Sequence, residues 1–201
     1  MIQEFLAVFI PLLIIVNPSS SLALFSILTA KKSKEEKLQT ARNAVIYASI
    51  LLIIFALAGS SILDYLGISI PALRIAGGLL LGAVGLDMLR RGEQFGESPS
   101  GMKEKTDYAL VPLALPYLSG PGAITLTIVT MKTASFVIVL LAILLTMVIT
   151  FIIFASSLLI IRVLGTKGMD ALTRIMGLLT VAIAVQFALT GIAEWLPTIS
   201  F

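Results

Sequence analysis

The chain has 201 residues, of which 58% are hydrophobic and only 12% are charged, and its mean hydropathy is +1.08. Soluble domains carry about 25% charged residues, so this composition excludes a soluble enzyme, a nucleic-acid-binding domain and a disordered chain, and it makes lipid the main solvent. The net charge is +3, and the absence of Cys and His excludes disulfides, thiolate metal sites and histidine proton relays.

Apolar runs of membrane-spanning length follow one another along the whole chain. They cover residues 5–30, 43–63, 69–89, 108–131, 135–161 and 171–196. A helix needs about 20 apolar residues to cross a bilayer. The strands of a membrane barrel are half as long and alternate in polarity, which these runs do not. The sequence therefore predicts an all-α membrane protein with six transmembrane helices.

The basic residues are distributed unevenly between the predicted loops. Eleven of the fourteen Lys and Arg residues lie in segments 31–42, 90–107 and 162–167, which fall on one side of a six-span chain. Lys132 is the only basic loop residue on the other side. Because basic loops stay in the cytoplasm, we expect a multi-pass protein of the cell (plasma or inner) membrane with both termini outside the cytoplasm.

A polar segment divides the chain into two similar halves. Residues 92–107 are rich in Gly, Ser and charge, which predicts a cytoplasmic linker between a three-helix unit at 1–91 and a second unit at 108–201. Arg74-Ile75 and Gly77 recur 100 residues later as Arg174-Ile175 and Gly177. Since each half has an odd number of spans, the second half would enter the membrane from the opposite side. This predicts two inverted three-helix repeats.

The first and fourth apolar runs are interrupted by proline. Asn17 and Pro18 lie near the middle of the first run, and they suit the cap and first residue of a new helix. We expect one half-helix to end near Val16 and another to begin at Pro18. In the fourth run, Ser119 or Gly120 would cap a half-helix that begins at Pro121. Each interruption alone fits an ordinary proline kink, whereas two in corresponding places favour a binding site.

The interrupted helices supply charge without ionised side chains. A half-helix start offers free N–H groups and about half a positive charge, which suits a carboxylate. The freed carbonyls suit an ammonium group or an alkali cation. The surrounding side chains are small, which predicts a small pocket and no metal or catalytic site. The candidate substrate-binding residues are Asn17, Pro18, Ser19, Ser20, Ser21, Ser119, Gly120, Pro121, Gly122 and Ala123.

Four further polar residues are candidates for gating or for lining a cavity. Arg74 and Arg174 lie near opposite ends of the third and sixth spans, where arginines either form gates or extend to lipid headgroups. Thr125 either lines the cavity or bonds its own backbone. Gln186 either lines the cavity or bonds a neighbouring helix.

Three motifs resemble those of a known family. They are Asn17-Pro18, Gly-Ile-Ser-Ile-Pro at 67–71 and Gly-Pro-Gly-Ala-Ile at 120–124. With these motifs, nearly the whole chain resembles the MarC family of integral membrane proteins, which includes SnatA-type small neutral amino acid transporters. The resemblance implies ion-coupled transport of glycine, alanine or similar amino acids. The Ser19-Ser20-Ser21 run departs from the Gly or Thr of many members, which would shift the preferred substrate size.

The leading hypothesis is a secondary transporter of small neutral amino acids that works by alternating access. Na⁺ or H⁺ is the expected coupling ion, and without a mid-membrane carboxylate Na⁺ is chemically easier. The alternatives are an exporter of another small metabolite and a passive channel or scaffold. An intramembrane enzyme is not expected, because the spans hold no Ser with a His or Lys partner and no carboxylate pair. The expected partners are the substrate and the bilayer, with no cofactor and no nucleic acid, and the sequence leaves the oligomeric state open.

Overall fold

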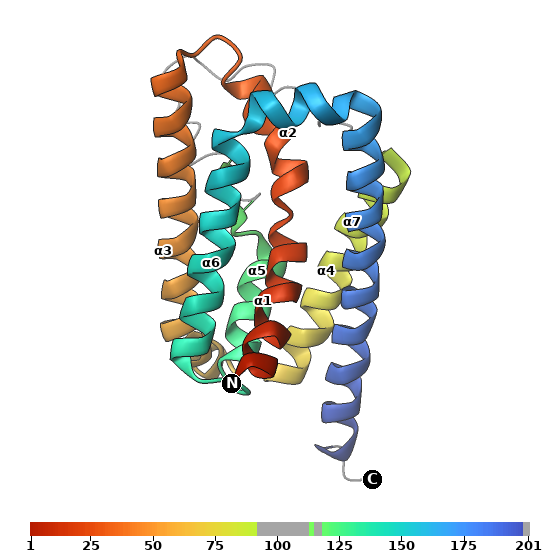
Figure 1. Ribbon diagram of the computed structural model, residues 1–201. Helices are drawn as coiled ribbons and strands as arrows, with labels where there is room; N and C mark the ends of the chain where they lie inside the picture. Colours follow the sequence, from red (N-terminus) through yellow and green to blue (C-terminus); the bar gives the residue numbers. More distant parts are fainter. Residues whose placement is uncertain (92–112, 115–117, 199–201) are drawn as a thin grey trace.

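The computed structural model describes residues 1–91, 113–114 and 118–198, and in these ranges the regular structure is helical without strands (Figure 1). The helices are α1 (Ile2–Val16), α2 (Pro18–Leu28), α3 (Lys34–Leu66), α4 (Ile70–Arg91), α5 (Pro121–Thr130), α6 (Phe136–Ala155), α7 (Ser157–Trp195) and the short 3₁₀ helix η2 (Leu196–Thr198). The all-helical prediction is confirmed for these residues.

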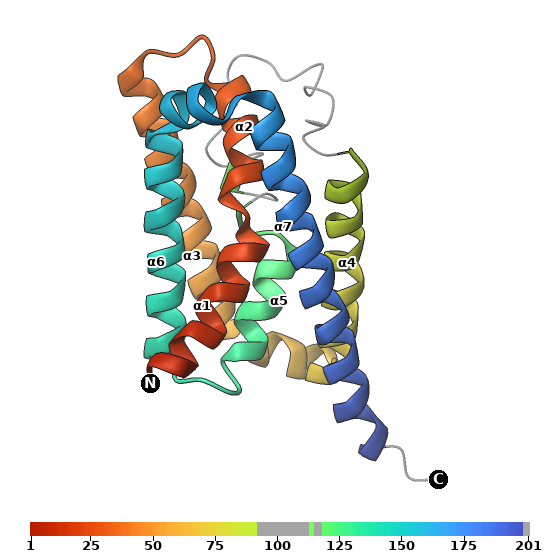
Figure 2. The same cartoon turned by 45° about the vertical axis from the view of Figure 1, so that its right-hand side comes forward.

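Most of the helices run along a common axis, and the short α5 lies among them (Figures 1 and 2). The N-terminus, the C-terminus, the α3–α4 turn and the α5–α6 loop lie at one end of the bundle. The α2–α3 loop, the end of α4 and the start of α7 lie at the other end, which we call the basic end because the basic segments gather there. The start of α1 and the end of α7 therefore lie at the same end of the bundle.

Five helical segments in the described ranges are long and apolar enough to cross a membrane. They are Ile2–Leu28, Lys34–Leu66, Ile70–Arg90, Phe136–Ala155 and Lys167–Trp195. The predicted fourth span, 108–131, appears as the ten-residue α5, whose length of about 15 Å is half of the hydrocarbon thickness. Residues 108–112 and 115–117 of that span, and the predicted linker 92–107, lie outside the described residues. Six spanning helices are therefore not confirmed.

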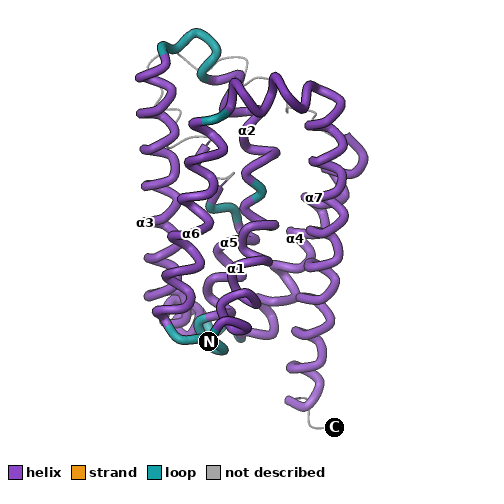
Figure 3. Tube along the Cα trace, viewed as in Figure 1, coloured by secondary structure: helices purple, strands orange, loops and turns teal. Residues whose placement is uncertain are grey.

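The predicted fifth span, 135–161, is wrong at its end. α6 ends at Ala155, and residues 157–164 form a separate helical stretch that crosses the basic end of the bundle (Figures 1 and 3). Gly165 then turns the chain along the bundle axis with φ 61° and ψ −177°. Only glycine adopts this backbone conformation readily. The segment containing Arg162, predicted to be a loop, is therefore a helix.

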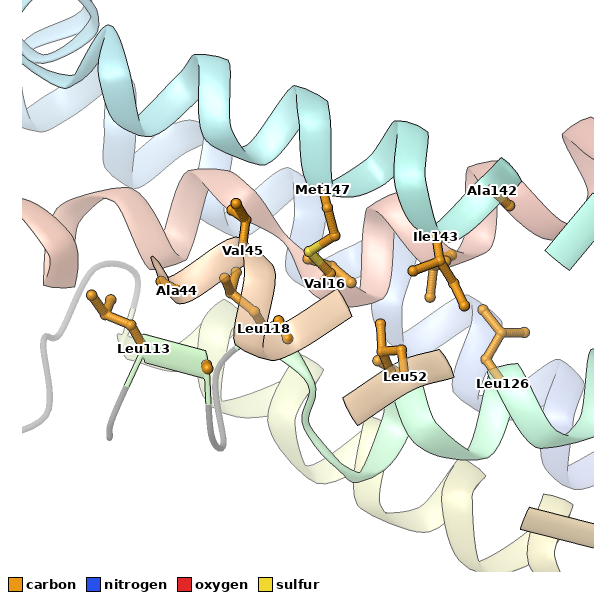
Figure 4. Close-up of a cluster of buried hydrophobic side chains, with 14 of the residues drawn as sticks. Val16, Ala44, Val45, Leu52, Leu113, Leu118, Leu126, Ala142, Ile143 and Met147 are labelled. Atoms are coloured by element: carbon orange, nitrogen blue, oxygen red, sulfur yellow. The ribbon is translucent and has the colours of Figure 1, made fainter. Parts of the chain in front are cut away.

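The buried core lies between α1, α3, α5 and α6 (Figure 4). Val16, Leu52, Leu126 and Ile143 meet there, each at most 3% exposed. Large apolar side chains also cover the outside of the bundle, including Leu79, which is 69% exposed. A soluble protein rarely exposes so much apolar surface, so the surface fits a hydrocarbon surrounding.

α4 and α7 pack against each other along their length as a separate pair. Their backbones approach closely where glycines meet: a Cβ on Gly85 would lie 2.9 Å from the carbonyl oxygen of Gly177. Such backbone contact is typical of membrane helices, whose association depends on close packing. The candidate site described next lies where α4 of this pair meets α1 and α5.

Candidate functional site

The first predicted interruption is present and has the predicted chemistry. α1 ends at Val16, and α2 begins at Pro18, which has no N–H to donate to the preceding turn. Between them, Asn17 adopts the left-handed conformation with φ 46° and ψ 69°, which asparagine tolerates better than most residues. Its side-chain Oδ1 accepts a hydrogen bond of 3.4 Å from the Ser20 N–H. Asn17 is thus both the end of one helix and the cap of the next.

The side chains of Asn17 and Ser21 at this interruption have hydrogen-bond partners within the protein. Asn17 is only 6% exposed, and its Nδ2 donates over 3.7 Å to the sulfur of Met88 on α4. The buried Ser21 hydroxyl donates to the Asn17 carbonyl over 3.3 Å. Pro18 is buried, and Ser19 and Ser20 are half-buried. The interruption is therefore a packed joint between α1, α2 and α4.

The second interruption, at the start of α5, has a different geometry. Gly120 is the N-cap in an extended conformation, with φ −65° and ψ 170°, and Pro121 is the first helical residue. Of the two predicted caps, the structure uses Gly120. The Ser119 hydroxyl instead donates back to the Ala114 carbonyl over 2.7 Å. In the described part of the chain, no side chain caps the first turn of α5.

A cavity of about 220 Å³ lies at this uncapped helix start. It is lined by Ile15, Leu81, Val84, Gly120, Pro121, Gly122 and Ala123. Its lining side chains are all apolar, so backbone groups are its polar atoms. Ile15 lies two residues before Asn17, so the cavity joins the neighbourhoods of both interruptions. Four of the predicted substrate-binding residues, Gly120 to Ala123, are brought together here, whereas Asn17 to Ser21 do not line the cavity.

Gly122 determines how closely the cavity walls approach. A Cβ on Gly122 would meet the Leu81 side chain, and it would lie 3.2 Å from Cγ2 of Ile15. No larger residue therefore fits here without displacing one of these side chains. The small residue that the sequence analysis chose for its size is a point of contact between α1, α4 and α5.

Thr125 lies one turn further along α5 and is buried. It points to α4, because a Cβ on Gly77 would lie 2.9 Å from its hydroxyl oxygen. Thr127 on the same helix instead returns its hydroxyl to the Ala123 carbonyl over 2.7 Å. Within the described ranges, Thr125 makes no such bond to its own backbone, and its side chain lies at the α4–α5 contact.

The two predicted gating arginines link α4 and α7 at opposite ends of that pair. Nε of Arg74 lies 3.2 Å from Oε2 of Glu194, at ion-pair distance but without the alignment of a hydrogen bond. Nε of Arg174 donates to Asp170 over 3.1 Å, and its Nη1 donates to the Leu89 carbonyl over 3.2 Å. Arg74 is mostly buried, whereas Arg174 is about half-exposed.

Gln186 lies apart from the cavity. It is exposed on α7, and its Nε2 donates over 3.1 Å to Thr190 on the same helix. The structure thus places its amide neither among the cavity walls nor across to a neighbouring helix.

The sequence analysis missed the apolar walls of the cavity. Ile15, Leu81 and Val84 carry no polar signal, and apolar residues in an apolar helix look alike in sequence. Only Ile15 had a detectable clue, because it lies next to the predicted interruption. Met88 and Glu194, the partners of Asn17 and Arg74, had no spacing that pointed to them.

Comparisons with known proteins agree with a membrane location. The family model described as MarC family integral membrane protein matches residues 2–196. A UPF0056 membrane protein of Methanocaldococcus jannaschii is 40% identical, over 95% of this chain and 97% of that protein. The UPF0056 inner membrane protein MarC of Escherichia coli O1:K1 is 33% identical over 93% of both chains. No solved structure matches this chain.

Proposed function

The chain belongs to the MarC family of integral membrane proteins, and from this premise we propose that it is a secondary transporter of small neutral amino acids. Glycine and alanine are the proposed substrates, with serine as a further candidate. The proposal assigns no catalytic residue. The names of the relatives state no substrate, so the proposal rests on the candidate site and on the resemblance noted from the sequence.

The observation that carries the proposal is the uncapped start of α5 at a small apolar cavity. The first-turn N–H groups of a helix favour an anion such as a carboxylate. A cavity of about 220 Å³ lies below the range of about 300–1,000 Å³ that holds drug-sized ligands. A short aliphatic side chain fits the walls of Ile15, Leu81 and Val84. A small zwitterion therefore suits this site better than a large drug does.

The proposed mechanism is alternating access between two inverted three-helix units, with the span at 108–131 completing six crossings. Two features support it. Arg74 and Arg174 are 100 residues apart and link the same two helices at opposite ends, as a two-fold axis in the membrane plane would require. The unwound chain at Asn17 and the start at Gly120 supply the discontinuous helices of such transporters.

In this proposal the basic end faces the cytoplasm, and both termini lie outside it. Arg74 and Arg174 act as gates, because breaking their contacts would free one end of the α4–α7 pair at a time. Freed carbonyls near Val16 are the proposed ligands of a coupling cation, Na⁺ in the first instance and H⁺ as the alternative. Uptake driven by a sodium gradient alone, compared with uptake driven by a pH gradient alone, decides between the two ions.

The test uses the purified chain in proteoliposomes loaded with buffer, with radiolabelled glycine and alanine outside. We expect saturable uptake that Gly120→Leu abolishes, because a large side chain would fill the cavity at the helix start. Leu57→Ala is the matched control, since Leu57 is 60% exposed on the outer surface, and it should transport like the wild type.

Three results would contradict the proposal. Flux that rises linearly with concentration would indicate a passive channel. Neither flux nor binding of amino acids by folded protein would indicate a scaffold or another substrate. Wild-type uptake by Gly120→Leu would separate transport from the start of α5.

A further inference from the structure

A second cavity lies at the basic end of the bundle, away from the start of α5. Its volume is about 180 Å³, and it lies between the first turns of α3 and the junction of α6 and α7. Lys34, Lys37 and Leu38 line it from α3, and Phe154, Ala155, Ser157 and Leu158 line it from the junction. The cavity thus combines two lysine side chains with walls that are apolar except for Ser157, unlike the cavity at Gly120.

The two lysines are available to an anion. Lys34 and Lys37 are three residues apart on α3, so they share one face of the helix. Within the described residues, neither ammonium group has an ion pair or a hydrogen bond. Of the neighbouring acids, Glu36 accepts the Ser33 N–H over 2.7 Å in the capping box of α3, and Glu35 follows Lys34 directly and faces another direction. Of these charged residues only Lys34 and Lys37 line the cavity, so the charged side chains at its mouth are positive.

The apolar walls belong to a helix that lies across the basic end. Residues 157–164 run across the bundle before Gly165 turns the chain (Figures 1 and 3). Leu158 and Val163 on this stretch are 67% and 75% exposed, and Arg162 follows Leu158 by four residues on the same face. A helix with exposed apolar residues and a basic residue, lying across the end of a membrane bundle, is typical of the headgroup region of a bilayer.

We propose that this cavity binds an anionic phospholipid. The phosphate group lies between Lys34 and Lys37, and the first part of an acyl chain packs against Phe154 and Leu158. Inorganic phosphate would use the lysines alone and would leave the apolar walls in contact with water. A zwitterionic lipid would bring a second positive group to a positive mouth. Charge and wall chemistry together therefore select an anionic lipid.

The test is native mass spectrometry of the purified full chain titrated with phosphatidylglycerol or with phosphatidylcholine of the same acyl chains. We expect the wild type to prefer phosphatidylglycerol. The double variant Lys34→Gln/Lys37→Gln should bind it roughly 30-fold more weakly. Each lysine near an anionic headgroup contributes about 1 kcal/mol to the binding free energy, and about 1.4 kcal/mol corresponds to a tenfold change in affinity. The control Lys31→Gln/Lys132→Gln removes the same charge from residues that do not line the cavity and should bind like the wild type.

Two further arms separate the sources of the phosphate and the role of the walls. An excess of inorganic phosphate should leave phosphatidylglycerol bound, and Ala155→Trp should weaken binding by filling the cavity while it keeps both lysines. Displacement by inorganic phosphate would overturn the proposal in favour of a free-anion site. Equal losses in the two lysine variants, or unchanged binding in Ala155→Trp, would overturn it in favour of non-specific attraction.

Discussion

Two places where proline interrupts an apolar run are built in opposite ways. At the α1–α2 joint, Asn17 caps the new helix with its own side chain and is packed against α4. At the start of α5, Gly120 offers no side chain to cap the helix, and a cavity lies beside the first turn. The start of α3 is a third kind, in which Ser33 and Glu36 form a complete capping box.

The difference shows that a proline interruption is not by itself a binding site. A helix start whose N–H groups meet a side-chain cap has less capacity for a ligand. The Asn17 side chain therefore already caps α2, whereas the start of α5 at Gly120 has no side-chain cap within the described residues and is where the proposed function places the substrate carboxylate. The sequence analysis treated the two as equal parts of one site, and only the second lines the cavity.

The largest effect is expected from Asn17→Ala, which should abolish uptake while the protein remains in the membrane. The left-handed backbone conformation costs alanine about 1–2 kcal/mol, and the substitution also removes a helix cap that contributes about 1 kcal/mol to stability. Asn17→Gly is the matched variant, because glycine accepts the conformation, and it should recover most of the uptake. If Asn17→Gly is as inactive as Asn17→Ala, the amide itself contacts the substrate and the two interruptions are alike.

Gly122→Val should lower the initial rate of uptake by about tenfold to 100-fold, because overpacking costs about 1–3 kcal/mol. The new Cβ would lie 2.8 Å from Cγ of Leu81 and would close the cavity from within. Gly82→Ala is the control, since its Cβ would meet Cβ of Ala184 at an ordinary 3.8 Å. Equal losses in both variants would place the sensitivity in α4 packing rather than at the cavity.

Leu81→Ala should change which amino acids are transported. Leu81 is buried and forms a wall of the cavity, so its truncation makes room for a longer substrate side chain. One methylene in an apolar pocket changes discrimination by about tenfold or more. We expect the ratio of valine to alanine uptake efficiency, measured by competition, to rise by about tenfold. An unchanged ratio would mean that the substrate side chain lies elsewhere.

Ser33→Ala should have the smallest effect on transport, because Ser33 lines no wall of the cavity at Gly120 and binds no substrate in the proposal. It removes a cap that contributes about 0.5–2 kcal/mol, so thermal unfolding of the purified protein should begin at a lower temperature. The initial rate of uptake should stay at the wild-type value. A fall in uptake would tie the start of α3 to the transport cycle.

The parts of the fold that follow from local chemistry could be predicted from the sequence. Asn followed by Pro in an apolar run indicates where one helix ends and another begins, and the structure has the joint at those residues. The end of α6 could not be found in this way, because residues 157–161 continue its apolar run. The turn at Ser156, with φ −92° and ψ 12°, separates α6 from the stretch at 157–164, and Gly165 separates that stretch from the rest of α7.

The candidate site shows the same division. Gly120 to Ala123 could be chosen from the sequence because Gly and Pro interrupt a helix locally. Their partners on α1 and α4 could not, since Ile15, Leu81 and Val84 are apolar residues among many and their contact depends on how separate helices pack.

Composition and local residue chemistry alone determined that this chain is a helical membrane protein with its basic residues at one end and with helix interruptions at Asn17-Pro18 and Gly120-Pro121. Only the tertiary structure decided which interruption opens on a cavity, which helices pair and where the helix at 157–164 lies. The physical reason is range: propensity, capping and hydropathy act within a few residues along the chain, whereas a cavity is formed by side chains that the sequence separates by a hundred positions.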